Sequence, residues 1–219
     1  ILPEEAYTFG ADTWTIPKGE LKTTASVKID LNKIEEVGSL YDDYVLPVRI
    51  ASSTGEPMGQ NKYTKVLAHI GFKNDYSGTY SGKGVITQQG TTYTTEITST
   101  LLYAINNNVC YMFVGEKTRA NTQDYLNYVV EIERNEWGGI VLSSNVEGLQ
   151  FKPYSAKLSR KYTYNYNDQR YYTEITTIEL AYEYLDSTQG EPLMMSFEGT
   201  FSMSRDVLRV EYPDVDVEE

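Results

Sequence analysis

The chain has 219 residues and a formal net charge of -12, from 19 lysines and arginines against 31 aspartates and glutamates. The length allows one large β domain or two smaller domains, each with a real core. The acidic balance argues against nucleic-acid binding, because no basic cluster could neutralise several phosphates, and it disfavours anionic membrane surfaces. Twenty tyrosines favour β-structure, while one histidine and one cysteine leave little for nucleophilic or metal chemistry.

The first third of the chain predicts a small β domain. Pro17 to Glu20 predicts a tight turn, because proline fixes φ and glycine permits positive φ. The turn introduces a strand from Lys22 to Asp30, with apolar residues on one face. A second strand from Tyr44 to Ile50 contains Pro47, which donates no ladder hydrogen bond and so favours a sheet edge or a bulge. A third strand is expected from Tyr63 to Ile70.

A helical turn and a domain boundary complete this part of the prediction. Leu31 to Val37 fits one short helical turn, and Trp14 is expected in a strand within the core. The polar run from Gly71 to Asp75 marks a boundary. We therefore predict a small Ig-like β-sandwich over residues 1–72 and a second domain over residues 73–219.

From Tyr76 onward the sequence predicts a long antiparallel meander of roughly eight strands. Glycine recurs on one face between Tyr76 and Ile86, which suits a strongly bent strand. The segments Lys157 to Tyr166 and Arg170 to Leu185 predict a hairpin around Asn167, Asp168 and Gln169. The final segment, from Val210 to Glu219, predicts a frayed acidic tail.

A meander of this length tends to close and remove its exposed edges. We therefore predict an all-β fold in which a lipocalin-like antiparallel barrel follows the small sandwich, with a second β-sandwich as the alternative. Cys110 lies in an apolar run and is expected as a core residue. Four large residues assigned to the inner face would fill a small interior: Tyr103, Met195, Phe197 and Phe201.

The sequence predicts no catalytic residue, metal site or cofactor. His69 is the only histidine, and no HExxH, CxxC or GxSxG spacing occurs. Carboxylates could still supply the pair that a glycoside hydrolase needs, which leaves that activity as the least favoured alternative. Six glutamates fall mostly on polar faces of strands, where solvated positions are expected: Glu96, Glu131, Glu133, Glu174, Glu179 and Glu183.

One aromatic surface is the candidate binding site. Tyrosines near the hairpin turn could stack on sugar rings while neighbouring polar groups bind hydroxyls, and Trp137 in another turn is a second candidate. The competing interpretation is a cross-strand tyrosine ladder that only stabilises the hairpin. The candidate glycan-binding residues are Trp137, Tyr162, Tyr164, Tyr166, Asn167, Asp168, Arg170, Tyr171 and Tyr172.

Four segments carry a family resemblance by their order and spacing: Leu2–Glu5, Thr15–Glu20, Val27–Ile29 and Tyr44–Ile50. They resemble the domain of unknown function at the N-terminus of many Bacteroidetes surface lipoproteins, which shows an IPxG turn, a strand and then YVLPLRI. The part from Tyr76 onward resembles the lipocalin-like domain of unknown function that commonly follows. Together the two cover almost the whole chain, although only the first carries sharp motifs.

This resemblance implies an exported, lipidated protein displayed at the cell surface. Such proteins are described as adhesins or glycan-binding proteins, and their motifs transfer no site residue. Relatives have further strands before the matching region, so the first domain is expected to be truncated at its front. We predict a non-enzymatic protein of the outer membrane surface that binds glycans or mediates adhesion, anchored only through a lipid upstream of this chain. The alternative is an assembly role through sheet edges such as Tyr44 to Ile50.

Overall fold

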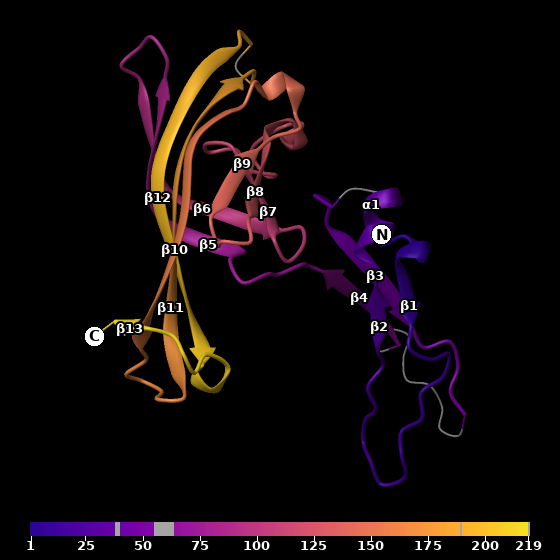
Figure 1. The fold of residues 1–219 in the computed structure, drawn as a ribbon. Coiled ribbons are helices and arrows are strands. Elements are labelled where there is room, and N and C mark those ends of the chain that lie inside the picture. The colour runs from indigo at the N-terminus through magenta and orange to yellow at the C-terminus, as the bar shows by residue number, and fades with distance from the viewer. Residues whose placement is uncertain (38–39, 55–63, 189, 219) are drawn as a thin grey trace. The chain divides into compact units, whose positions relative to one another are not determined.

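The structure is a computed structural model in which residues 1–37, 40–54, 64–188 and 190–218 are described. The chain divides into two compact units, Ile1–Gly71 and Phe72–Glu219 (Figure 1). The boundary expected from the sequence lies one residue further along the chain.

The N-terminal unit contains two small antiparallel sheets. Strand β1 pairs with β2, and β3 pairs with β4. In chain order its elements are the 3-10 turn Glu4–Ala6, β1 (Tyr7–Phe9), β2 (Val27–Ile29), α1 (Leu31–Val37), β3 (Tyr44–Arg49) and β4 (Lys65–Ile70). Its buried apolar side chains are Leu2, Ala6, Ile34, Tyr44 and Leu46. The unit therefore consists of two strand pairs, which confirms a small β domain, while their arrangement as an Ig-like sandwich stays a prediction.

Two local predictions for this unit are confirmed. The short helix forms as α1, and the side-chain oxygen of Asp30 accepts a hydrogen bond from the backbone N–H of Asn32 at 3.1 Å, which caps its first turn. The turn at Pro17 also forms, because the N–H of Glu20 donates to the Pro17 carbonyl at 3.0 Å. Gly19 lies between them at φ 92°, a conformation that glycine adopts without strain.

The strand predicted from Lys22 to Asp30 is too long. Only Val27–Ile29 pairs, because the partner β1 offers just three residues, and residues 10–26 form an exposed loop. Trp14 lies in this loop with 38 % of its surface exposed, against the edge of the Phe9 ring, so its assignment to a core strand was wrong. Tyr63, the expected start of the third strand, lies outside the described residues.

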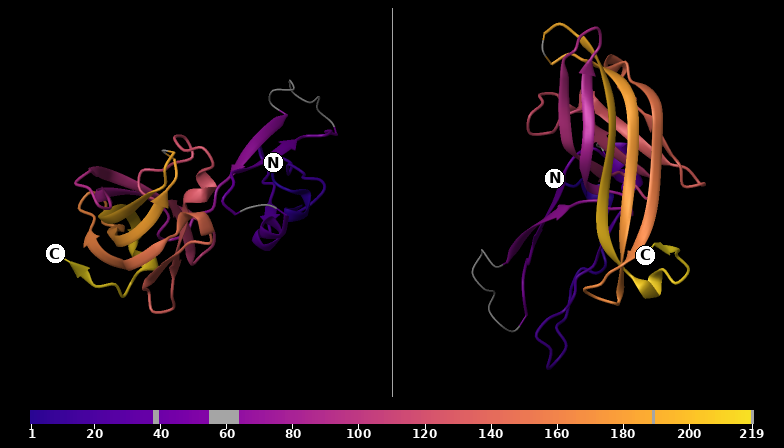
Figure 2. Two further views of the ribbon diagram at one scale, coloured as in Figure 1. Left: turned by 90° about the horizontal axis from the view of Figure 1, so that it is seen from above. Right: turned by 90° about the vertical axis from the view of Figure 1, so that its left-hand side faces the viewer.

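The C-terminal unit is an up-and-down β meander, as predicted (Figures 1 and 2). Its strands are β5 (Gly78–Gln88), β6 (Thr94–Ala104), β7 (Val109–Phe113), β8 (Val129–Arg134), β9 (Ile140–Ser143), β10 (Lys152–Tyr164), β11 (Tyr171–Asp186), β12 (Leu193–Leu208) and the short β13 (Val217–Glu218). Three 3-10 turns lie between or after them: Tyr125–Tyr128, Glu147–Leu149 and Arg209–Glu211.

Strand pairing almost closes this meander into a barrel. Each strand from β5 to β9 pairs with the next, as do β10, β11 and β12, and β12 returns to pair with β5. In the described part of the chain, β9 and β10 approach each other without forming a ladder. We call this gap in the ladder the seam. The predicted all-β, lipocalin-like barrel is thus confirmed, with one seam.

Large side chains fill the barrel interior, and three of the four residues that we assigned to it are found there. Met195, Phe197 and Phe201 are all buried, and the Phe197 ring stacks on Tyr182 with centroids 4.7 Å apart. Gly84 makes room for them, because a Cβ at this position would lie 2.8 Å from both phenylalanine rings.

Tyr103, the fourth residue assigned to the interior, lies instead on the outer face of the barrel. There its ring stacks on Tyr111 at a centroid distance of 4.9 Å. The cause is a register shift between Ser81 and Gly84 in β5, which changes the inward phase of β6 so that Leu102 faces the core. A strict period of two cannot anticipate such a bulge.

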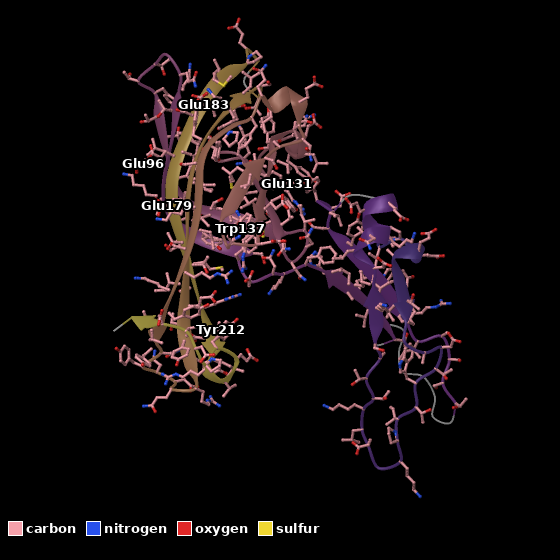
Figure 3. All side chains as sticks on the ribbon, in the orientation of Figure 1. Glu96, Glu131, Trp137, Glu179, Glu183 and Tyr212 are labelled. Atoms are coloured by element: carbon pink, nitrogen blue, oxygen red, sulfur yellow. The ribbon has the colours of Figure 1, made fainter. Side chains whose placement is uncertain are left out.

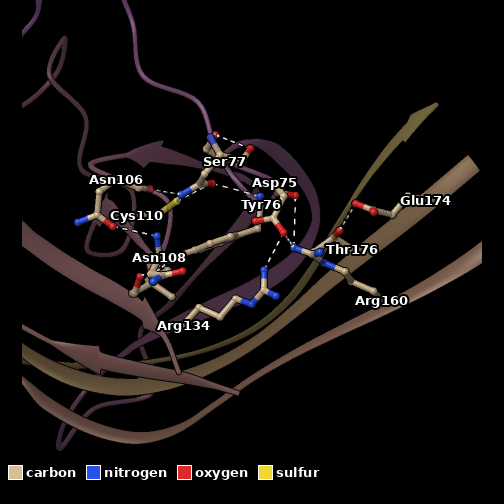
Figure 4. Close-up of polar contacts among 12 residues, drawn as sticks. Asp75, Tyr76, Ser77, Asn106, Asn108, Cys110, Arg134, Arg160, Glu174 and Thr176 are labelled. Carbon is tan, nitrogen blue, oxygen red and sulfur yellow. Dashed lines mark hydrogen bonds and ion pairs between the residues drawn. The ribbon is translucent and has the colours of Figure 1, made fainter. Parts of the chain in front are cut away.

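The Asp75 carboxylate spans the seam at one end of the barrel (Figure 4). One of its oxygens lies 2.6 Å from Arg134 of β8 and 2.8 Å from Arg160 of β10. Burial alone would raise the pKa of Asp75, but hydrogen bonds and charge from the two guanidinium groups outweigh it and hold the pKa below its usual range. Cys110 lies close by with no exposed surface, which confirms it as a core residue.

Replacing Gly84 by alanine tests the tight packing of the barrel. The new methyl group would meet Phe197 and Phe201 at less than van der Waals distance, so we expect the free energy of unfolding to fall by about 1–3 kcal/mol. Gly148→Ala is the matched control, because nothing lies within 4 Å of its Cβ position. Chemical denaturation measures both variants, and equal stability for the two would contradict this packing.

We call Asp75 with its partners Arg134 and Arg160 the clamp, and replacing Asp75 by asparagine tests it. We expect the free energy of unfolding to fall by about 1–3 kcal/mol near neutral pH, because Arg134 and Arg160 lose their charged acceptor. A carboxyl whose pKa is lower in the folded protein stabilises the fold at pH values above its unfolded pKa, and this contribution is lost as the pH falls. The difference in unfolding free energy between the variant and the wild type should therefore shrink as the pH falls below about 4. Glu96→Gln, which removes an exposed pair with Lys83, is the control. A deficit that does not change with pH would refute the clamp.

Candidate functional site

The predicted tyrosine hairpin forms the far part of β10 and β11. The pairing of β12 with β5 stops at Ser202, while β10, β11 and β12 continue together beyond the barrel. We call this extension the arm: residues 162–174 and 203–218, which include the hairpin turn, the end of β12 and β13. Figure 1 shows the three long strands running side by side away from the barrel.

Three of the candidate tyrosines share one face of the arm. Tyr164 lies directly opposite Tyr172 in the ladder, with ring centroids 5.9 Å apart. The guanidinium of Arg209 lies over both rings, at 5.0 Å from Tyr164 and 4.7 Å from Tyr172. These rings therefore stabilise the hairpin through cross-strand and cation–π contacts, which is the competing interpretation given above.

Tyr162, the third tyrosine on this face, is held by a buried carboxylate. Its hydroxyl donates to Glu174 at 3.0 Å, and burial raises its pKa. Glu174 has no exposed surface, so its assignment to a solvated polar face was wrong. The ladder register explains the burial, because Arg205 lies opposite Glu174 on β12 and binds its carboxylate at 2.8 Å.

Other glutamates on the list behave as the polar-face prediction required. Figure 3 shows Glu96, Glu179 and Glu183 distributed over the barrel strands. They pair with Lys83, Lys157 and Lys152, respectively. Ion pairs of this kind at the surface of a sheet stabilise it only weakly.

The polar residues of the hairpin turn mostly bind each other. The Asp168 carboxylate accepts hydrogen bonds from the Arg170 guanidinium at 3.0 and 2.6 Å, and these hold the pKa of Asp168 at about 2. The Asn165 side chain accepts from the N–H of Asn167, as in an ordinary Asx turn. Tyr166 projects from this turn with 86 % of its surface exposed.

Trp137 is separate from the arm. It lies in the turn between β8 and β9, 90 % exposed, where the Asn135 side chain organises the backbone by accepting from the N–H groups of Trp137 and Gly139. Figure 3 labels Trp137 on the barrel and Tyr212 on the arm. The structure thus does not combine Trp137 with the tyrosine hairpin into one surface.

The structure reveals a hollow of about 510 Å³ where the arm leaves the barrel. We call it the arm hollow. Tyr171 is the only one of the predicted candidate residues among its lining residues. The lining residues are Asn74, Asp75, Tyr171, Arg205, Asp206, Val207, Leu208, Glu211 and Tyr212.

Tyr212 of the arm hollow was missed because the last ten residues were assigned to a frayed tail. Among the described residues of that tail, Val217 pairs with Tyr162 in the parallel strand β13, and Tyr212 packs against the same ring at 5.9 Å. The segment is therefore folded back onto the arm. An aromatic residue within an otherwise acidic stretch was the signal available in the sequence.

The arm hollow combines aromatic surface with fixed polar groups. Arg205 is neutralised by Glu174, and Asp206 accepts a hydrogen bond from the Thr173 hydroxyl at 3.1 Å. Tyr171 and Tyr212 add two half-buried rings. A few oriented polar groups beside apolar rings suit a ligand with an apolar face and several hydroxyls.

The described parts of the chain contain neither a metal-binding group of side chains nor a helix that could span a membrane. Within these parts, no group of three or more histidine, cysteine, aspartate or glutamate side chains could hold a metal ion. His69 lies at the surface, 3.8 Å from Asp43. Residues 1–37, 40–54, 64–188 and 190–218 contain no helix long and apolar enough to cross a membrane.

Comparison with solved structures finds the same fold in Bacteroides proteins. A multidomain protein of Bacteroides ovatus that includes DUF1735 shares 18 % identity and a TM-score of 0.77, over 98 % of this chain and 75 % of its own. A protein of unknown function from the same species shares 19 % identity and a TM-score of 0.77, and the match covers 98 % of this chain and 72 % of that protein. An auxiliary nutrient binding protein of Bacteroides thetaiotaomicron shares 20 % identity and a TM-score of 0.61, and the match covers 78 % of this chain and 59 % of that protein. At these identities the likeness establishes the fold alone.

Family models match both parts of the sequence. A model described as an N-terminal domain matches residues 1–57, and a model described as a C-terminal domain matches residues 64–202. No curated protein matches the chain. Because the C-terminal model alone covers more than half of the sequence, the chain belongs to the Bacteroidetes family whose N-terminal and C-terminal domains these models describe.

Proposed function

We propose that this protein is a non-enzymatic, extracytoplasmic module that binds glycans at the cell surface. The observation that carries the proposal is the arm hollow, in which Tyr171 and Tyr212 stand beside Asn74, Arg205 and Asp206. Its volume of about 510 Å³ lies in the range of ligand sites, which is about 300–1,000 Å³.

The chemistry of the arm hollow favours a sugar over a purely apolar ligand. A pyranose presents an apolar face that can stack on tyrosine, and hydroxyls that can exchange hydrogen bonds with amide, carboxylate and guanidinium groups. Because Asp206 and Arg205 are already oriented by Thr173 and Glu174, they lose little conformational freedom on binding.

Two further points support binding without catalysis. A glycoside hydrolase needs one carboxyl with a raised pKa as general acid, whereas two arginines lower the pKa of Asp75 in the arm hollow. A relative in fold is called an auxiliary nutrient binding protein, which supports a role in capturing nutrients at the cell surface.

An assembly role is the second candidate, and the N-terminal unit favours it. Strand β4 exposes two apolar side chains, Val66 at 61 % and Leu67 at 75 % of their surface. Exposed apolar residues on a short strand suit contact with a protein partner. The edge of β3, which the sequence suggested, is partly occupied because the N–H of Leu2 donates to the Val45 carbonyl.

Calorimetric titration against a panel of host and plant polysaccharides tests the glycan function. We expect saturable binding to at least one of them, weakened about three- to tenfold by Tyr171→Ala and by Tyr212→Ala, because each loses one stacking ring. Tyr154→Ala is the matched control, since this exposed β10 tyrosine lies outside the arm hollow and contacts Lys152. Circular dichroism verifies that each variant is folded.

The other exposed aromatics identify the outcomes that would contradict this proposal. If Tyr166→Ala or Trp137→Ala abolished binding while Tyr171→Ala and Tyr212→Ala did not, the glycan would bind at the turns and the arm hollow would be the wrong site. If no polysaccharide of the panel bound, the glycan function would be refuted, and the assembly role would become the leading candidate.

A further inference from the structure

A second pocket lies at the end of the barrel far from Asp75. It forms where the β5–β6 turn, the loop after β7 and the β11–β12 turn meet, and its volume is about 210 Å³. We call it the mouth pocket. Its lining residues are Ile86, Gln88, Tyr93, Thr95, Glu116, Lys117, Tyr184, Asp186, Leu193 and Met195.

The mouth pocket has an apolar floor and a polar rim. Ile86, Tyr184 and Met195 belong to the buried barrel core and close it from below. Gln88 and Thr95 supply an amide and a hydroxyl above them. This arrangement is typical of a small-molecule site, although the volume is below the range for drug-sized ligands.

Tyr184 supplies an independent sign of a ligand. Its side chain is only 1 % exposed and lines the pocket, and none of the hydrogen bonds found among the described residues involves its hydroxyl. The neighbouring core tyrosines differ, because Tyr182 accepts from the N–H of Gly115 at 3.1 Å and Tyr80 donates to the Tyr76 carbonyl at 2.7 Å. The Tyr184 hydroxyl is not among the fully enclosed polar atoms that lack a partner, so it is a polar group of the pocket wall that a bound molecule can reach.

Gly115 keeps the space beside this hydroxyl open. It has φ 58°, and a Cβ at this position would lie 2.4 Å from the Tyr184 oxygen. The loop therefore approaches Tyr184 through backbone alone. No side chain of residue 115 can serve as the missing partner.

The charges around the pocket favour a neutral ligand. Lys117 and Asp186 form an ion pair at 2.7 Å with side chains only 11 % and 10 % exposed, and Lys117 also donates to Thr188 at 3.0 Å. The only lining cation is thus neutralised, and Glu116 adds a negative charge. An anionic ligand would meet net repulsion here.

We propose that the mouth pocket binds one neutral, hydroxyl-bearing ring of monosaccharide size, with the Tyr184 hydroxyl as its buried hydrogen-bond partner. Ile86, Leu193 and Met195 contact the apolar face of the ring, and the rim residues Gln88 and Thr95 bind its outer hydroxyls. This site is separate from the arm hollow and does not depend on glycan binding there.

Tyr184→Phe tests the proposal because it removes the hydroxyl and keeps the ring. The probes are free neutral monosaccharides, each titrated at tens of millimolar into the isotope-labelled full chain while backbone amide NMR signals are recorded. We expect at least one sugar to shift signals of residues 86–88, 115–117 and 184–195, and Tyr184→Phe to weaken that binding about three- to tenfold. Uronic acids, which carry a negative charge, should give no shift.

Tyr80→Phe is the matched control at the other end of the barrel. It removes a satisfied hydroxyl, so we expect it to lower the melting temperature and to leave monosaccharide binding unchanged. Tyr184→Phe should bind the sugar less tightly and keep the wild-type melting temperature, because no protein hydrogen bond is lost.

Three results would overturn the proposal. They are no shift at the mouth residues with any neutral monosaccharide, equal binding by Tyr184→Phe, and a loss of stability in Tyr184→Phe as large as in Tyr80→Phe. Binding at the arm hollow is distinguishable in the same spectra, because it should shift signals of residues 205–212 and should be weakened by Tyr171→Ala and Tyr212→Ala.

Discussion

The C-terminal unit depends on how its open seam is closed. Backbone ladders join every neighbouring pair of strands around the barrel except β9 and β10. Near that seam one carboxylate links the two sides, since Asp75 binds Arg134 on the β8 side and Arg160 on the β10 side. The same clamp fixes β10 where it leaves the barrel, so it also sets the wall of the arm hollow that Asp75 lines. The same group therefore contributes both to closure of the barrel and to the wall of the arm hollow.

A filled interior moves any ligand to the ends of the barrel. Gly84 lies directly opposite Gly199 on β12, and the two missing side chains leave space for the rings of Phe197 and Phe201. An up-and-down barrel of this strand number has room for side chains or for one small ligand, and here aromatic side chains take the space. Two of the hollows that the described residues form are the arm hollow at one end and the smaller mouth pocket at the other. The barrel acts as a scaffold for both.

The sequence predicted what depends on local patterns. Alternation along β10 and β11 predicted the hairpin, and the Pro17 and Leu31 segments predicted a turn and a helix, because each signal lies within a few neighbouring residues. Features that depend on distant partners were missed. Glu174 is buried by a ladder register that places Arg205 opposite it, and Tyr212 joins a site through a tail that folds back. A bulge in one strand changed the phase of its neighbour and moved Tyr103 outward. Register and bulges are set by pairing across the sheet, which one segment does not encode.

The many tyrosines of this protein separate by what their hydroxyls bind. Tyr76, Tyr80 and Tyr182 exchange hydrogen bonds with backbone groups inside the barrel and so join its strands and loops. Tyr184 occupies an equally buried position, but a glycine backbone faces it and leaves its hydroxyl for another molecule. Among these core tyrosines, Tyr184 is therefore the one whose hydroxyl the proposed ligand of the mouth pocket would bind.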